Sequence, residues 1–312
     1  MSCARARALA PGSRVAVVAP ASPFRREDFF AGVDELRALG FDVVWDDRVF
    51  SRSGFVAGAP EARAASLREA ILDPAVAGII AVRGGYGSAQ LLPWLDAEEM
   101  AAARKPLVGY SDVTALLSWT TLQCGVVAFH GPMLEGRLAR GEAGYDRDSF
   151  LRALCDDGPL GELAADGLEA VRPGEAAGVL LGGTLTQLLA SFGTPWAFDP
   201  PRGTILFVDE VGERPYRLDR MFTQLRQSGV LARVSAVVFG ELPGCDEPGG
   251  EATARGTVAD LLRGFPGPIL FGFPSGHTSG PTWTLPFGVE ARVVAGAGRP
   301  RLIVTSPAVE RR

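Results

Sequence analysis

We predict an α/β fold of two domains from three features of the sequence. The chain has 312 residues, enough for two domains that each bury a core of their own. Hydrophobic residues make up 47% of the chain and charged residues 21%, which is the balance of a globular protein rather than of a disordered one. From Arg14 onward, short apolar runs alternate with segments of helical period, a pattern typical of mostly parallel sheets with crossover helices.

The first part of the chain predicts a parallel sheet covered by helices. Each apolar run has about the length of one buried strand; the runs are residues 15–19, 42–45, 78–82, 107–109 and 126–129. One helix is predicted from apolar residues at helical spacing, and it stops at Gly40, a plausible C′ glycine. Its apolar positions are Phe29, Phe30, Val33 and Leu36. Val113, Leu116 and Leu117 begin a second helix of the same kind.

A change of composition divides the chain. Residues 136–177 are rich in Gly, Asp, Glu and Ala, so we predict a linker there, between domains at 1–135 and 178–312. The second domain repeats the strand pattern at 178–181, 204–208, 236–239 and 269–273. Its C-terminal end is predicted to be rich in β structure, because runs separated by Pro and Gly indicate antiparallel strands that close this domain. Those runs are residues 283–285, 289–294 and 302–304.

Charge and composition exclude several classes of protein. A net charge of −5 gives no general reason to bind nucleic acid or an anionic membrane. No apolar stretch approaches the roughly 20 residues of a membrane-spanning helix, and the N-terminus does not resemble a secretory signal, so the cytoplasm is expected. The four cysteines lie far apart without a CxxC pair, which favours neither a zinc site nor a disulfide framework.

The first candidate for chemistry is Ser111. An apolar strand runs into Gly109-Tyr110-Ser111-Asp112 and then into a helix, which is the arrangement of a nucleophile elbow. The start of that helix would stabilise a developing oxyanion. From the local sequence alone, capping of the helix by Ser111 or Asp112 is the favoured interpretation.

The second candidate is the glycine-rich segment Arg83-Gly84-Gly85-Tyr86-Gly87, which directly follows a predicted strand. Glycines let the backbone approach a ligand and turn N–H groups toward it, as an oxyanion hole requires. A phosphate-binding loop would need a GxGxxG or P-loop pattern, and neither is present. A plain turn is the remaining alternative.

Two further segments supply a possible acid and a possible base. A strand ends on Asp209 and Glu210, at the edge where α/β sheets commonly bind ligands, although these charges and Glu213 could simply flank a helix. Histidine occurs only twice, and serine chemistry needs a base near pH 7. His277 lies in a loop of small residues after a strand, where a functional role is favoured. His130 could be the base, a substrate contact or a histidine held by backbone groups.

Together these segments resemble the LD-carboxypeptidase family of serine peptidases, the muramoyltetrapeptide carboxypeptidases. The resemblance spans nearly the whole chain and is carried by seven segments in order. They are VVAPASP, RGGYGSAQLLPWLD, KPLVGYSDVTALL, FHGPM, LGGTLTQLLASFGTPW, LFVDEVGERPYRLDRMFTQLRQSG and GFPSGHTSGPTWTLPFGV.

The resemblance implies a fold and a catalytic site. It implies an N-terminal Rossmann-like (flavodoxin-like) domain, and a C-terminal α/β domain with a β-rich, swivelling or barrel-like end. By the family pattern Ser111 is the nucleophile and His277 the base. The backbone N–H groups of Asp112 and of Gly84 and Gly85 hold the oxyanion. No metal or cofactor is implied, and the molecule is expected to be a homodimer.

Two positions depart from the family pattern. The strand usually ends in Glu followed by Asp, whereas here Asp209 precedes Glu210. We favour Asp209 as the acid of the triad because Asp orients histidine in other triads, with Glu210 as the alternative. Thr184 stands where relatives often carry Asn, which leaves a substrate contact there open.

The substrate implied by the resemblance is a small peptide, a cytoplasmic murein tetrapeptide that loses its terminal D-alanine during cell-wall recycling. Arg83, with the amides of Gly84 and Gly85, is the candidate for binding the terminal carboxylate. An immunity peptidase acting on peptidyl-nucleotide antibiotics is the alternative within the family. An inactive ligand-binding homologue is a third possibility, and the missing GxGxxG pattern argues against a nucleotide-dependent oxidoreductase.

Overall fold

Two sheets form the framework of the molecule, seen here in a computed structural model that describes residues 3–296 and 298–311. The first sheet has the order β13-β6-β5-β4-β2-β3. Its strands are β2 (Arg14–Val18), β3 (Asp42–Trp45), β4 (Gly78–Ala81), β5 (Leu107–Gly109), β6 (Ala128–His130) and β13 (Leu285–Phe287). The five strands other than β13 are parallel. Numbered by their order in the chain, they lie across the sheet as 2-1-3-4-5, the flavodoxin-like order predicted for this domain.

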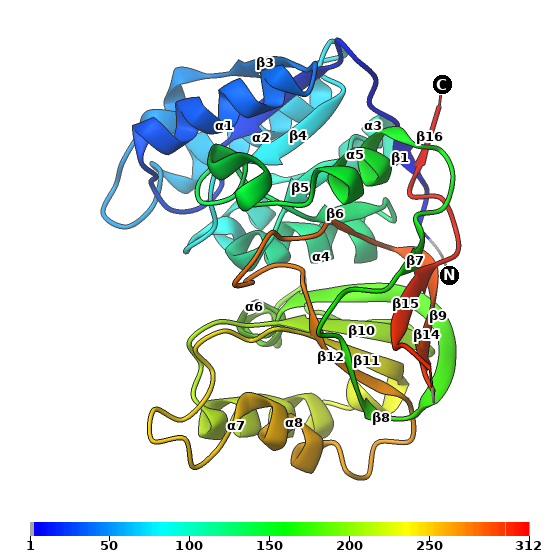
Figure 1. Cartoon of the computed structure of the whole chain (residues 1–312). Helices are drawn as coiled ribbons and strands as arrows, with labels where there is room; N and C mark the ends of the chain where they lie inside the picture. The colour runs from blue at the N-terminus through cyan, green and yellow to red at the C-terminus, as the bar shows by residue number, and fades with distance from the viewer. Residues whose placement is uncertain (1–2, 297, 312) are drawn as a thin grey trace.

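Helices cover the first sheet (Figure 1). The α-helices are α1 (Arg26–Ala38), α2 (Pro60–Leu72), α3 (Ala97–Ala103), α4 (Thr114–Leu122) and α5 (Arg147–Cys155). The 3-10 helices are η1 (Asp47–Phe50), η2 (Ser88–Trp94), η3 (Ser111–Val113) and η4 (Leu138–Ala143). In α1, Phe29, Val33 and Leu36 are buried as expected, but Phe30 is 44% exposed because it lies beside the buried stripe rather than on it.

The second sheet has the order β7-β15-β14-β9-β10-β11-β12-β8 and lies below the first in Figure 1. Its central strands β9 (Gly174–Thr184), β10 (Thr204–Asp209), β11 (Val234–Gly240) and β12 (Ile269–Phe273) are parallel. The outer strands are antiparallel to their neighbours: β7 (Gly161–Leu163), β8 (Glu169–Arg172), β14 (Val289–Ala295) and β15 (Arg301–Val304). The helices of this half are α6 (Leu185–Ala190), α7 (Pro215–Gln227), α8 (Ala254–Leu261) and η5 (Leu231–Arg233).

The two halves share strands near the chain ends. The run 283–285 was predicted to be a strand that closes the second domain, and this placement is wrong. The strand found there is β13, and it pairs antiparallel with β6 of the first sheet. Apolar alternation marks a strand but does not say which sheet edge it joins. The segment 136–177 holds α5 and the two edge strands β7 and β8 of the second sheet. Near the termini, β1 (Ala6–Arg7) pairs in parallel with β16 (Val309–Glu310).

Long apolar helices are absent from the part of the chain that the structure describes. In residues 3–296 and 298–311, no helix has both the length and the hydropathy required to cross a bilayer.

The neighbouring residues Phe29 and Phe30 give a matched test of the packing of α1. Phe29 is 0% exposed and contacts the rings of Phe24, Trp45 and Phe50. We expect Phe29→Ala to lower the free energy of unfolding by about 3–5 kcal/mol, because it removes a fully buried ring and leaves a cavity. Phe30→Ala should cost about 1 kcal/mol or less. Urea denaturation of both variants measures this, and equal losses would contradict the burial pattern.

Candidate active site

Ser111 lies on a strained turn at the carboxyl end of β5. Its φ is +61°, an unusual value for a residue other than glycine, and such strain collects at functional sites. Gly109 makes the turn possible, since a Cβ there would lie 2.6 Å from Cγ1 of Val113. η3 begins at Ser111, so the strand, turn and helix of a nucleophile elbow are all present.

Helix capping does not account for Ser111 or Asp112. Neither η3 nor α4 has a side-chain hydrogen bond at its N-cap. The carboxylate of Asp112 is buried and accepts a hydrogen bond of 2.7 Å from the backbone N–H of Ser88 instead. That bond ties the elbow to the start of η2, the segment that follows the glycine-rich loop.

The glycine-rich loop packs directly against the elbow. A Cβ on Gly84 would lie 2.9 Å from Cβ of Ser111 and 3.1 Å from its Oγ, so only glycine fits. Gly85 has φ +98°, and its Cβ position is occupied by Oγ of Ser22 at 2.5 Å. Ser22 fixes the loop further, since its N–H donates to the carbonyl of Gly84 and its Oγ accepts from N–H of Tyr86.

Arg83 is the candidate for recognising the free carboxylate of a peptide, and it is already partly engaged. Its Nε lies 2.9 Å from Oε2 of Glu135, and its Nη1 donates to the carbonyl of Pro23. The side chain remains 43% exposed. One N–H of the guanidinium thus donates a hydrogen bond to the protein, and its Nε side is held in the ion pair with Glu135.

His277 and Asp209 form a hydrogen-bonded pair, in which the carboxylate is buried and the imidazole is partly exposed. Asp209 ends β10 and is 0% exposed. Its Oδ2 lies 2.7 Å from Nδ1 of His277, and its Oδ1 accepts the backbone N–H of the same residue at 3.0 Å. Burial opposes ionisation, but the hydrogen bonds and charge of His277 outweigh it and lower the pKa of Asp209. Asp209 is therefore an ionised carboxylate that fixes both the backbone and the ring of His277.

Glu210 points away from this pair. Its carboxylate accepts hydrogen bonds from N–H and Oγ1 of Thr186 and from N–H of Val211. Burial raises the pKa of Glu210, and those hydrogen bonds offset only part of that effect. Of the two acids left open by the sequence, the structure places Asp209 on the histidine.

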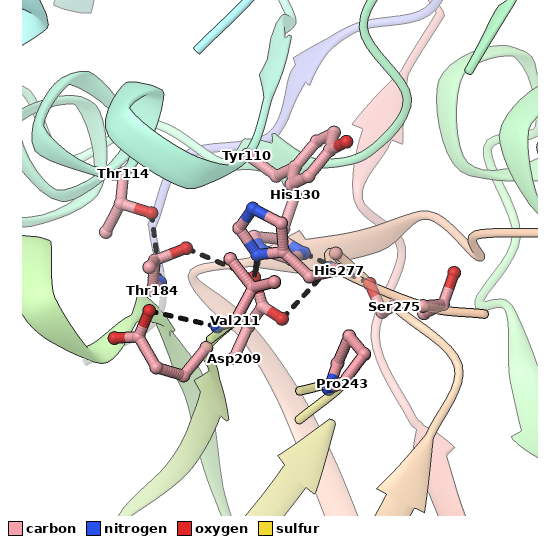
Figure 2. Close-up of polar contacts among 12 residues, drawn as sticks. Tyr110, Thr114, His130, Thr184, Asp209, Val211, Pro243, Ser275 and His277 are labelled. Carbon is pink, nitrogen blue, oxygen red and sulfur yellow. Dashed lines mark hydrogen bonds and ion pairs between the residues drawn. The ribbon is translucent and has the colours of Figure 1, made fainter. Parts of the chain in front are cut away.

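A threonine bridge joins Asp209 to the helix that follows Ser111. Oγ1 of Thr184 donates to Oδ2 of Asp209 at 3.1 Å, and N–H of Thr184 donates to Oγ1 of Thr114 at 3.1 Å. Figure 2 shows this line of contacts from Thr114 through Thr184 to Asp209 and His277. Thr184 thus orients the acid.

The two halves meet at the residue before the serine. The ring of Tyr110 packs edge-on against the ring of His277, with centroids 5.1 Å apart. Within residues 3–296 and 298–311, no hydrogen bond joins Ser111 to His277. Such bonds are often long in the absence of substrate and shorten when it binds.

His130 is fully buried and lies close to Asp209. Of the three roles that the sequence left open for it, direct contact with a substrate does not fit a side chain with no exposure. Its ring packs between Phe207 and Phe287. Ser275 Oγ donates to the carbonyl of Trp283 and therefore accepts from Nδ1–H of His130 at 3.0 Å. Nε2 of His130 then carries a lone pair, has no hydrogen-bond partner among the described residues, and lies 4.0 Å from Oδ2 of Asp209. Burial lowers the pKa of His130 to about 4.

Several supporting residues escaped sequence reasoning. Ser22 and Ser275 lie within segments quoted for the family resemblance, VVAPASP and GFPSGHTSGPTWTLPFGV, but a lone serine carries no signal of its own. Arg137 is 93% buried against the loop of His277, although its segment is polar and rich in glycine, where an arginine ordinarily indicates a solvated surface. No group of three or more His, Cys, Asp or Glu side chains suited to a metal ion occurs in the part of the chain that the structure describes.

Comparison with known families decides the affiliation. Residues 15–131 match the model of the LD-carboxypeptidase N-terminal domain, and residues 177–293 match that of the C-terminal domain. The chain belongs to the LD-carboxypeptidase family. The matched N-terminal segment bears Ser111, and the matched C-terminal segment bears the Asp209–His277 pair.

Individual relatives agree with this affiliation. A Streptomyces coelicolor protein with a provisional carboxypeptidase name is 40% identical over 298 residues, covering 93% of each chain. The murein tetrapeptide carboxypeptidase of Pseudomonas aeruginosa is 32% identical over 85% of this chain and 88% of its own length. The crystal structure of a muramoyltetrapeptide carboxypeptidase from Oxalobacter formigenes is similar over 94% of this chain and 99% of its own, with 30% identity and a TM-score of 0.83.

The buried His130 predicts a pH dependence of stability. An unfolded histidine titrates near pH 6.5, whereas His130 in the folded chain titrates at about 4. Between these values the unfolded chain binds more protons, so stability falls as the pH is lowered from 6.5 to 4, by at most about 3 kcal/mol. Asp209 stays ionised in the folded chain over this window because its pKa is lowered, and its own effect on stability begins only as the pH approaches about 3.9, where an unfolded Asp titrates.

We therefore expect urea unfolding of the His130→Gln variant to depend less on pH between 6.5 and 4.5 than that of the unmodified protein. The comparison uses the slope against pH, so a uniform loss of stability in the variant does not disturb it. Parallel slopes would show that His130 keeps an ordinary pKa.

Proposed function

We propose that the chain is a serine carboxypeptidase that removes the terminal D-alanine from a murein tetrapeptide in the cytoplasm, during cell-wall recycling. The observation that carries the proposal is the Asp209–His277 hydrogen bond, whose histidine ring packs against Tyr110, the residue before a serine with φ +61°. A strained serine, a histidine and an orienting carboxylate are the three parts of a serine hydrolase site.

The first half of the reaction forms an acyl-enzyme. His277 Nε2 takes the hydroxyl proton of Ser111 while Oγ attacks the carbonyl carbon of the bond between the L-centre and the terminal D-residue. The resulting oxyanion lies toward the backbone N–H groups of Asp112 and Gly85. His277 then returns the proton to the leaving nitrogen, the C–N bond breaks, and D-alanine leaves.

Hydrolysis of the acyl-enzyme repeats these steps with water. His277 takes a proton from water, the hydroxide oxygen attacks the ester carbon, and the proton returns to Ser111 Oγ as the tripeptide leaves. Asp209 holds the proton on Nδ1 of His277, which leaves Nε2 as the basic nitrogen in both halves. The ionised Asp209 also stabilises the imidazolium formed in each step.

Recognition of the substrate requires a group for the free carboxylate of the terminal residue. Arg83 is our candidate, since its half-exposed guanidinium adjoins Gly84 and keeps N–H donors beyond those bound to Glu135 and Pro23. A peptide bound there would place its terminal residue beside the elbow.

A digest of a purified murein tetrapeptide, followed by mass spectrometry, tests the proposal. We expect release of one terminal D-alanine and formation of the tripeptide. Ser111→Ala should lower kcat by about 10⁴-fold or more, because members of a triad act as a unit. A peptidyl-nucleotide substrate forms the second arm, since the microcin C7 self-immunity protein of Escherichia coli is 28% identical to this chain.

Each outcome of that digest decides something. Cleavage of the peptidyl-nucleotide alone would replace the murein assignment, and cleavage of neither substrate would favour an inactive ligand-binding homologue. Near-normal turnover by Ser111→Ala would remove the serine from the mechanism.

The adjacent acids allow a matched comparison. Asp209→Asn preserves the shape of the side chain but cannot hold the proton on Nδ1 of His277 as the carboxylate does, so kcat should fall by about 10³- to 10⁴-fold. Glu210→Gln, one position away, should keep kcat within about tenfold, because Glu210 binds Thr186 and Val211 rather than the histidine. Steady-state kinetics measure both variants, and equal mild losses would show that neither acid is part of a triad.

A further inference from the structure

Arg137 is a buried cation in an unusual setting. Its side chain belongs to the residue before η4 and is 7% exposed. Within residues 3–296 and 298–311, no carboxylate lies within ion-pair distance of it. A buried guanidinium is costly unless its donors are satisfied. Here backbone carbonyls satisfy them in place of an acid.

Those carbonyls belong mainly to the loop that carries His277. Nη2 of Arg137 donates to the carbonyls of Gly276 at 2.9 Å and of Thr278 at 3.1 Å, the residues on either side of His277. Nη1 donates to the carbonyl of Gly280 at 3.0 Å and more weakly to that of Gly144 at 3.4 Å. The loop therefore curves around one guanidinium.

The same side chain reaches the residue before the nucleophile. Nε of Arg137 donates to the hydroxyl of Tyr110 at 3.3 Å, and Cζ lies 5.9 Å from the centre of that ring. Tyr110 precedes Ser111 and packs against the ring of His277. Arg137 is thus in contact with both elements whose relative position decides whether a proton can pass between Ser111 and His277.

The geometry points to Arg137 as a positioning residue, which holds the loop of His277 in register with the elbow of Ser111. This inference rests on the proposed function and adds to it a residue that positions the catalytic groups. The serine and the histidine come from different sheets, and a misplacement of about 1 Å between reacting groups costs about 100-fold in rate. A planar guanidinium directs its donors along fixed lines, whereas a lysine ammonium at the same place is a point charge on a flexible stem.

Lysine and alanine variants test this role through kinetics. We expect Arg137→Lys to lower kcat by about 10- to 100-fold while KM changes by less than about threefold, because the displaced groups do not bind the ground-state peptide. Arg137→Ala should lose at least as much. Arg140 lies three residues after Arg137, within η4, and is exposed, so Arg140→Ala is the matched control and should behave as the unmodified protein.

Chemical rescue separates positioning from general stability. Guanidinium chloride at a non-denaturing concentration should restore part of the kcat of Arg137→Ala, since the free cation fits the space and the carbonyls left behind. Sodium chloride at equal ionic strength should not, and neither salt should rescue Ser111→Ala. A normal kcat in Arg137→Lys, or a loss in Arg137→Ala that guanidinium leaves unchanged, would overturn the inference.

A readout without turnover keeps the test independent of the substrate. The chain has only two histidines, so ¹⁵N-histidine spectra resolve His277 and His130. We expect Arg137→Lys to move the ring signals of His277 more than those of His130, and guanidinium to reverse the change in Arg137→Ala. An unmodified protein that cleaves no peptide would reject the proposed function, whereas unmoved His277 signals would reject the role of Arg137.

Should both Arg137 variants fail to fold, the Tyr110→Phe variant provides the test. It removes only the hydroxyl that accepts a hydrogen bond from Nε of Arg137, and an unchanged kcat and His277 spectrum would count against the inference.

Discussion

The rest of the site depends on the hydrogen bonds that the buried carboxylate of Asp209 accepts. It accepts three hydrogen bonds at short range, from the backbone and ring of His277 and from Thr184. A charge with no exposure is tolerated only when it is satisfied in this way. The carboxylate also requires glycine at position 276, because a Cβ there would lie 2.5 Å from Cγ of Asp209. The surroundings of the acid thus dictate the shape of the histidine loop.

Each of the two sheets supplies different residues of the site. The first sheet supplies Ser111 on a tight turn with a glycine loop packed against it, and the second supplies Asp209 at the end of a central parallel strand. Both residues lie at carboxyl ends of parallel strands, where α/β folds gather ligand-binding groups. Contacts through Tyr110, Thr114 and Arg137 bring these edges together. Each contact joins a residue of the first half to one of the second.

Local patterns predicted much of this arrangement, and long-range packing accounts for what they missed. The strand before Ser111 and the helix after it follow from apolar periodicity, so the elbow could be located from the sequence. The choice between Asp209 and Glu210 could not, because it depends on which side of β10 each carboxylate faces and on partners such as Thr186. The exposure of Phe30 was misjudged and the burial of Arg137 was not foreseen, for a shared reason: exposure is a property of the assembled fold, and residue type indicates it only on average.

The return of β13 to the first sheet has a consequence for how the gene can be divided. β6, which carries His130, would be an uncovered edge if the chain ended near residue 135, because its outer neighbour comes from residues 285–287. Exposed, unpaired strand edges favour aggregation. An N-terminal fragment therefore lacks part of its own sheet, and expression of the halves as separate polypeptides needs the C-terminal piece present to complete it. The two family domains follow one another in the sequence, yet a strand from the C-terminal domain forms the edge of the N-terminal sheet.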